Sequence, residues 1–302
     1  MNKTLLLAAT LLATVAIPAC AQPAPQAAPA ATTDADPALW VVKDADTTVY
    51  LFGTVHVLKP GLSWFDEAVK TAFDSSGELV LEMVQPEPAA VQALVAAKAN
   101  NPAGAPPLTQ QLPEAKRAAY TKALTDLGLP PAALDGYKPW FAAVNLSLIP
   151  MMKAGYTPGS GAESVLSAEA KKANKPVAGL ETMEQQLGFF DALPTDAQIT
   201  YLNSTVEQLP TINTMMDGMV ASWSAGDPAK LGELMNETLD DSPELAKTLL
   251  FDRNARWAQW IDTRMDKPGV VFVAVGAGHL AGKQSVQDYL AQRKLTATRV
   301  KY

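Results

Sequence analysis

The chain has only two histidines in its 302 residues, and each follows an apolar run that is typical of a buried strand. His56 ends the tetrad GTVH and His279 ends the tetrad GAGH, so both occupy the last position of a Gly-x-x-His pattern. Glu82 lies near the end of a third apolar run, ELVLEM. Ligands of open α/β sheets bind beyond the carboxyl ends of the strands, so we expect these three side chains to meet at one sheet edge.

Two imidazoles and one carboxylate are a common set of ligands for a hydrolytic divalent metal. Such an ion polarises a carbonyl group and lowers the pKa of its bound water from ~15.7 to about 7. The residue types therefore predict a divalent metal site made of His56, Glu82 and His279. They do not distinguish manganese, cobalt and zinc.

Three glycines of the two tetrads, Gly53, Gly276 and Gly278, are expected to shape this site, because glycine lets the backbone turn sharply or approach a ligand closely. The alternative for a single strand-end histidine is a structural residue that only forms hydrogen bonds. Matching tetrads in a chain with no other histidine favour a functional pair. The sequence contains no Gly-x-Ser-x-Gly elbow, no His-Glu-x-x-His pattern and no phosphate-binding loop.

The composition limits the class of partner. The formal net charge is −7 and the isoelectric point is about 4.9, which argues against nucleic acid or an anionic membrane surface. The expected partner is a peptide or a small-molecule substrate. The sequence leaves the oligomeric state open.

The amino-terminal segment has the features of an export signal. Residues 1–21 contain a short apolar run and a small-x-small sequence, which predicts a signal peptide cleaved before Gln22. The alternative is a lipoprotein anchored through Cys20, the only cysteine. Residues 22–38 are rich in proline and alanine and predict a linker. Residues 39–302 are then expected to form one exported domain, periplasmic or secreted, with no transmembrane span in the mature chain.

The secondary structure expected around these residues is that of an α/β fold. A hairpin is predicted over residues 39–55, and buried strands over 78–83 and 269–276. The segment between these two strands, about 84–268, is predicted to be a helical insertion with a minimal strand at 177–179. Its last helix is expected to run over 243–265. We therefore expect a central mixed β-sheet built from the amino- and carboxyl-terminal segments.

The chain resembles the TraB/GumN family, which includes the Tiki proteases of animals, in five pieces that occur in family order. They are LFGTVHVLKP, the glutamate of LVLEM, KPVAGLETMEQQL, DRNARWAQWI and VFVAVGAGHLAG. The resemblance extends over roughly residues 39–302. It implies a compact α/β fold similar to the erythromycin-esterase and ChaN-like group. It also implies the metal-dependent peptide hydrolysis of the Tiki branch, with manganese- or cobalt-type ions.

The resemblance adds further residues to the expected site. Glu181 is the acid of the GLET piece, Arg253 and Asn254 belong to the RN piece, and Glu163 stands where family members commonly have aspartate. We expect Glu181 or Glu163 to be the general base that takes a proton from metal-bound water. Arg253 is expected to stabilise the oxyanion or clamp a substrate carboxylate. The alternative for Arg253 is a salt bridge to Glu181 or Asp252 that only fixes a helix.

The function predicted from the sequence is a secreted metal-dependent hydrolase that cleaves peptide bonds through metal-activated water. Two alternatives stay open. One is a non-enzymatic binding protein for a peptide, a pheromone or a glycan fragment. The other is a metal-independent hydrolase that uses a histidine as its base.

Overall fold

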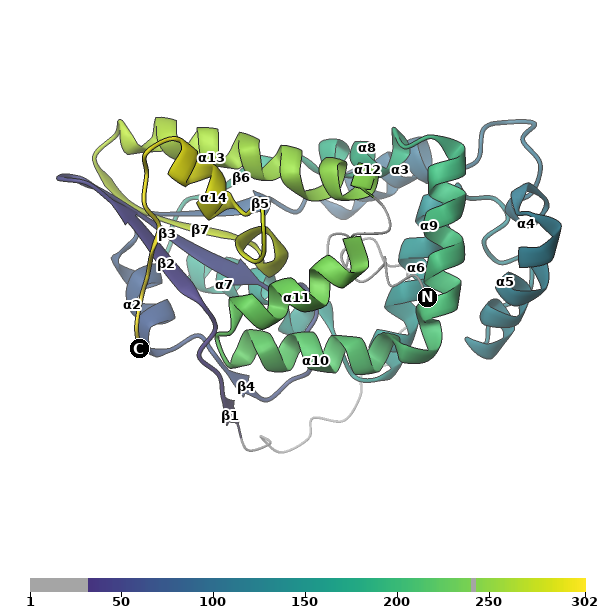
Figure 1. The fold of residues 1–302 in the computed structure, drawn as a ribbon, viewed down its shortest axis with the longest axis horizontal. Helices are drawn as coiled ribbons and strands as arrows, with labels where there is room; N and C mark the ends of the chain where they lie inside the picture. Colours follow the sequence, from purple (N-terminus) through teal and green to yellow (C-terminus); the bar gives the residue numbers. More distant parts are fainter. Residues whose placement is uncertain (1–31, 240–242) are drawn as a thin grey trace.

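The computed structural model describes residues 32–239 and 243–302, and the side chains of all of these except 236–239 and 243. A six-stranded mixed sheet forms the centre of the fold, in the order β6-β5-β7-β3-β2-β8 (Figure 1). The strands are β2 (Leu39–Lys43), β3 (Thr47–Thr54), β5 (Glu78–Met83), β6 (Val177–Glu181), β7 (Gly269–Gly276) and β8 (Thr298–Arg299). The α/β fold and its sheet from both ends of the chain are thus confirmed.

Five of the six strands run in the same direction. β3 pairs with β7, β7 with β5 and β5 with β6, all in parallel, and β2 is antiparallel to both of its neighbours, β3 and β8. The register between the two central strands ends with Thr54 opposite Gly276. The carboxyl ends of β3, β5, β6 and β7 therefore lie at the same edge of the sheet. Each of these strands is followed by, or ends in, one of the expected site residues.

Both faces of the sheet are buried, which explains the nearly continuous apolar run of β7. Phe272 and Ala274 belong to the large hydrophobic core on one face. Val271 and Val273 alternate with them and belong to a second core on the other face. That second core contains residues of α13 (Asp252–Met265) and α14 (Val286–Gln292), which lie along the sheet (Figure 1).

The segment between β5 and β7 is mainly helical and also contains the edge strand β6, which extends the strand expected at 177–179. Before it, α2 (Glu67–Ser75) connects β3 and β5. The helices of the insertion before α13 are α3 (Pro88–Ala99), α4 (Leu108–Gln111), α5 (Glu114–Asp126), α6 (Pro139–Lys153), α7 (Ala162–Lys172), α8 (Met183–Asp191), α9 (Thr195–Gln208), α10 (Ile212–Ser224), α11 (Pro228–Leu239) and α12 (Pro243–Ala246).

The helix expected over 243–265 is interrupted. A π-helical turn, η3 (Lys247–Phe251), lies between α12 and α13. π-Helical turns are rare and occur frequently at functional sites. This turn ends two residues before Arg253, and the carbonyl of Leu249 within it accepts a hydrogen bond from the Arg253 side chain.

A short paired segment precedes Leu39, within the range predicted as the linker. β1 (Thr33–Asp34) pairs in parallel with β4 (Leu62–Ser63), and Ala35 is buried. The backbone N–H of Ala35 donates to the carbonyl of Ser63, so this short segment is held by hydrogen bonds as well as by packing. The predicted signal peptide, Cys20 and most of the predicted linker lie outside the described residues.

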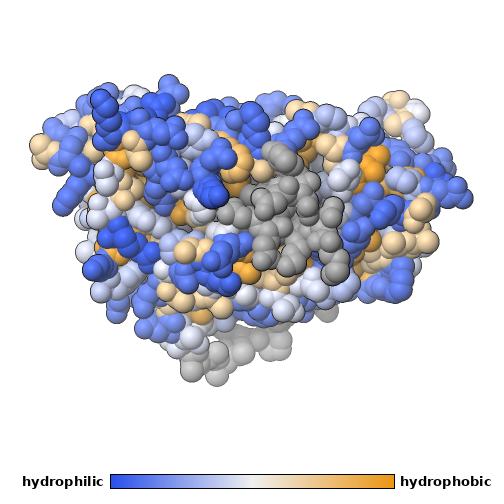
Figure 2. Space-filling model, in the orientation of Figure 1, coloured by the Kyte–Doolittle hydropathy of each residue, from blue (hydrophilic) through white to orange (hydrophobic). Residues whose placement is uncertain are grey.

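The described surface has few large apolar side chains. On the face shown in Figure 2, hydrophobic residues occur in small groups among hydrophilic ones. No helix within residues 32–239 or 243–302 has both the length and the apolar character needed to cross a membrane.

Candidate functional site

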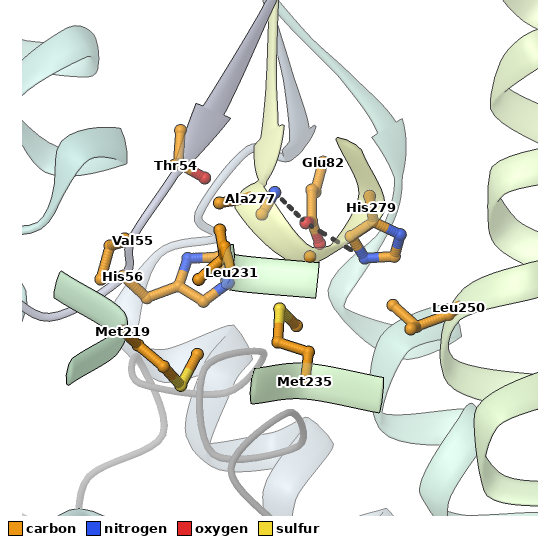
Figure 3. A pocket seen from close by; sticks show the side chains of 12 residues that line it. Thr54, Val55, His56, Glu82, Met219, Leu231, Met235, Leu250, Ala277 and His279 are labelled. Carbon is orange, nitrogen blue, oxygen red and sulfur yellow. Dashed lines mark hydrogen bonds and ion pairs between the residues drawn. The ribbon is translucent and has the colours of Figure 1, made fainter. Parts of the chain in front are cut away.

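The carboxyl ends of the parallel strands bring the two histidines and Glu82 around one small cavity (Figure 3). His56 lies two residues beyond β3, Glu82 is the second-to-last residue of β5, and His279 is in the short helix η4 (Ala277–Leu280) that follows β7. The cavity has a volume of about 30 Å³. A single water needs ~10–15 Å³, so the space accommodates one or two water-sized groups.

Arg253 is the centre of a buried cluster behind this cavity. Its side chain is fully buried, and all five of its N–H donors have partners. Nε donates to both carboxylate oxygens of Glu181 at 3.0 Å, and Nη2 donates to Glu82 at 2.6 Å and to Glu181 at 2.7 Å. Nη1 donates to Leu249 O at 3.1 Å and contacts His279 Nε2 at 3.2 Å. No N–H group of Arg253 is left to bind a substrate in this arrangement.

Glu82 is almost fully buried and ionised. Its Oε1 accepts a hydrogen bond from the backbone N–H of Gly276 at 2.7 Å, and its Oε2 accepts from Arg253 and, at 3.0 Å, from Gln186. Burial alone would raise the pKa of this carboxyl, but the Arg253 guanidinium and the nearby imidazoles outweigh burial and lower the pKa to about 2. The second lone pair of Oε1 is available on the cavity side.

His279 is held in one tautomer. Asn254 donates its amide N–H to Gln284 O at 2.7 Å, and Asn254 Oδ1 lies 2.6 Å from His279 Nδ1. Because an amide oxygen only accepts, Nδ1 must carry the proton and Nε2 keeps its lone pair. Arg253 Nη1 donates to that lone pair. Burial and the positive charge of Arg253 lower the pKa of His279 to about 3, so its ring is neutral.

His56 has a different environment, since its side chain and that of Glu163 are partly exposed. His56 Nδ1 lies 2.5 Å from Glu163 Oε1, which also accepts a hydrogen bond from the Thr54 hydroxyl. Burial alone would lower the pKa of His56, but the charge and the hydrogen bond of Glu163, together with the charge of Glu82, outweigh burial and raise the pKa. With the proton of Nδ1 directed at Glu163, the lone pair of neutral His56 is on Nε2.

His56 Nε2 faces the cavity. A methyl group placed on Gly276 would lie 3.8 Å from His56 Nε2, 3.0 Å from Glu82 Oε1 and 3.5 Å from His279 Cδ2. The absence of a side chain at Gly276 is therefore what leaves space among these three groups. Gly53 has a related role, because a Cβ there would lie 3.0 Å from the Ala277 Cα. Gly278 lines the same cavity.

The loop that carries His56 and the start of α7, which carries Glu163, are held together by backbone contacts. Leu58 and Thr157 form an antiparallel bridge, and the N–H of Ala162 donates to the carbonyl of Val55 at 3.0 Å. A Cβ on Gly161 would lie only 2.0 Å from His56 O. The close approach of these segments therefore requires glycine at position 161 and aligns the imidazole with the carboxylate.

The donor types around the cavity fit a divalent metal ion, with one condition. His56 Nε2 and Glu82 Oε1 each have a lone pair on the cavity side, whereas the Nε2 lone pair of His279 is engaged by Arg253 and lies 3.6 Å from Glu82 Oε1. Within the described ranges, no set of three or more His, Cys, Asp or Glu side chains is already arranged as a metal site. Binding through all three predicted ligands would require Arg253 Nη1 to release His279.

The remaining predicted residues are part of the support. Glu181, at the end of β6, is buried and paired with Arg253, and Gln186 donates to both Glu181 and Glu82. Asn254 orients His279. Sequence reasoning missed Thr54 and Gln186. Both lie inside quoted motif pieces, GTVH and ETMEQQL, so proximity in sequence to the predicted residues was the available signal.

Comparisons with known proteins agree with these motifs. The family model described as the TraB/PrgY/gumN family matches residues 38–299. An uncharacterized protein of Treponema pallidum (strain Nichols) is 23% identical over 272 residues, covering 85% of this chain and 80% of that protein. No solved structure matches the chain.

Proposed function

The chain belongs to the TraB/PrgY/gumN family, and from this premise and the site geometry we propose that it is an exported hydrolase that cleaves peptide bonds. In this proposal, His56 activates a water molecule in the small cavity for attack on the carbonyl carbon. Glu163 fixes the orientation of His56, and the cluster around Arg253 holds the opposite wall of the cavity in place.

The observation that carries the proposal is the pairing of His56 with Glu163. A carboxylate on Nδ1 directs the imidazole and stabilises its protonated form, and Nε2 then faces the space where a water fits. This is the arrangement of a general base with its orienting group. Glu181 is less suited to that role because both of its oxygens are bound by Arg253.

The reaction follows from this arrangement. As the water oxygen forms its bond to the carbonyl carbon, one water proton moves to His56 Nε2. When the C–N bond breaks, the same proton moves from His56 Nε2 to the leaving amine. The products are a carboxylic acid and an amine, and His56 returns to its neutral form. Glu163 accepts the hydrogen bond of His56 Nδ1 throughout and stabilises the transient imidazolium.

A metal-dependent form of the same hydrolysis is the second candidate, and it is favoured by the position of all three predicted ligands around one cavity. His56, Glu82 and His279 would hold the ion. When bound, a divalent ion supplies Lewis-acid polarisation of the carbonyl and a lower pKa for water. In that form Asn254 keeps the lone pair of His279 on Nε2, as a ligand requires.

The test is cleavage of a mixed peptide library by protein purified without a histidine tag, read by mass spectrometry. We expect cleavage by the wild-type protein and its loss in Glu163→Gln. The matched control is Glu169→Gln, which removes a carboxylate from the same helix that pairs only with Lys172 near the surface. Absence of any cleavage, with and without added metal, would refute the proposal and leave a binding protein as the better description.

The same assay separates the two forms. We run it after chelation with EDTA and after addition of Mn²⁺, Co²⁺ or Zn²⁺, and we record Tm in parallel. Full activity after chelation supports the His56 base alone. Loss on chelation, restoration by one ion and a rise in Tm with that ion support the metal-dependent form.

A further inference from the structure

Two cavities of different size lie beside His56 and Glu82, which line both of them. The small cavity of about 30 Å³ is the one that contains Gly276 and His279. The second cavity is larger, about 220 Å³, and contains Glu163. A substrate whose carbonyl group lies at His56 therefore has unequal space on its two sides.

The small cavity has an apolar wall. Met219 of α10, Leu231 and Met235 of α11 and Leu250 of η3 line it, and all four are buried. Figure 3 shows their side chains pointing toward the space beside the two histidines. A polar or charged group placed there would lose its water without gaining a hydrogen-bonding partner from this wall.

The larger cavity has a mixed lining. Leu81, Met83 and Pro158 give it apolar surface, and its polar side chains beyond His56, Glu82 and Glu163 are those of Gln85, Ser164, Ser167 and Gln186. Ser164 is exposed, and Ser167 is partly exposed. These hydroxyl and amide groups provide hydrogen-bond donors and acceptors for a peptide backbone or for polar side chains.

We propose that the two cavities select peptides asymmetrically: a small apolar side chain next to the cleaved bond enters the cavity walled by Met219 and Leu231, and a longer polar segment occupies the cavity lined by Ser164 and Ser167. This inference rests on the proposed function and adds its substrate class. The small cavity accommodates one or two water-sized groups, and the water at His56 is one of them, so the size limit admits the methyl group of alanine and excludes larger side chains.

The experiment measures kcat/KM for one cleaved peptide in which the residue on either side of the cleaved bond is changed in turn to Gly, Ala, Val, Phe, Asp and Lys. For wild-type protein we expect about tenfold preference for Ala over Val, Phe, Asp or Lys at one of the two positions. Leu231→Phe narrows the cavity and shifts the preference toward Gly. Met219→Ala widens the cavity and shifts the preference toward Val.

The matched control is Met216→Ala, which removes the same atoms from a buried position of the same helix that does not line the cavity. It is expected to lower Tm without changing the order of preference. Opposite shifts in two variants cannot both come from partial unfolding. If the protein cleaves peptides without a size preference, or if the preference shifts in the same direction in all three variants, this inference is wrong while the proposed function still holds. If wild-type protein cleaves no peptide, the proposed function is wrong, and this inference, which depends on it, is wrong as well.

Discussion

The two halves of the site use the same residue types in opposite ways. In the pair of His56 and Glu163, both side chains are partly exposed, and one imidazole nitrogen faces a cavity. In the cluster of Arg253, Glu82 and His279, the side chains are buried and bonded mainly to one another. The first half has a group free to exchange a proton with a ligand, whereas the second half has its charges balanced internally.

Under the proposed function, the partly exposed half performs the chemistry and the buried half supports it. A buried carboxylate or guanidinium is stable only when its partners are present, so the cluster must form as a unit. His56 forms an ion pair with Glu163 and lies in the loop after β3, where a proton can reach it. We therefore predict that substitutions in the cluster of Arg253 mainly lower stability, whereas substitutions of His56 or Glu163 mainly lower turnover.

The largest expected effect is that of Arg253→Met. It leaves Glu82 and Glu181 buried without their cation, which costs about 3–5 kcal/mol of unfolding free energy. We expect a fall in Tm of about 6–20 °C by scanning calorimetry. The matched control is Arg256→Met, because Arg256 is half exposed and lies 3.5 Å from Glu181. Equal Tm values for the two variants would contradict the structural role of the cluster.

His56→Ala is expected to have the opposite signature. Loss of the general base lowers kcat/KM by about 10²–10⁴-fold. Tm should stay within a few degrees of the wild-type value, because the side chain is partly exposed and its one strong partner, Glu163, can return to water. Kinetics on a cleaved peptide and calorimetry on the same sample check both parts. A large loss of stability with unchanged kcat/KM would assign His56 to the supporting half instead.

A smaller effect is expected from Gly161→Ala, which tests how the pair is aligned. The added Cβ would collide with His56 O, so the loop must move away from α7, at a cost of about 1–3 kcal/mol. We expect a lower Tm and a lower kcat/KM together. Gly159→Ala is the control, since its Cβ would be 3.9 Å from the nearest atom, the Thr157 hydroxyl oxygen. If both variants retain full activity, the close backbone approach is not what positions His56.

The sequence was sufficient to predict the sheet and the meeting of the strand ends. Apolar runs and glycines marked β3, β5 and β7, and parallel pairing then brought His56, Glu82 and His279 together. The roles were harder to predict, because they depend on side-chain pairing over long sequence separations. That Arg253 would bond to both Glu82 and Glu181, and Glu163 to His56, follows from the path of the helical insertion rather than from any local pattern.

The π-helical turn before Arg253 is another feature that the sequence did not reveal. Its residues, KTLLF, have ordinary helical character, so a continuous helix was expected. Burial of the Arg253 guanidinium requires a carbonyl acceptor for Nη1, and Leu249 O in this turn supplies it. The irregular backbone is thus associated with a tertiary contact, which local propensity does not report.

The central claim is that His56, oriented by Glu163, is the group that activates water. The most direct test is the pH dependence of kcat/KM for one cleaved peptide, measured with wild-type protein and with Glu163→Gln. The base must be neutral to act, and Glu163 raises the pKa of His56 above its ordinary value of 6.5. The wild-type rate should therefore rise with pH through a limb centred above 6.5. In Glu163→Gln burial still lowers the pKa of His56, while the charge of Glu163, the larger of the two opposing charges, is gone. That limb should therefore move to lower pH and the maximal rate should fall. An acid limb at the same pH in both proteins would contradict the account.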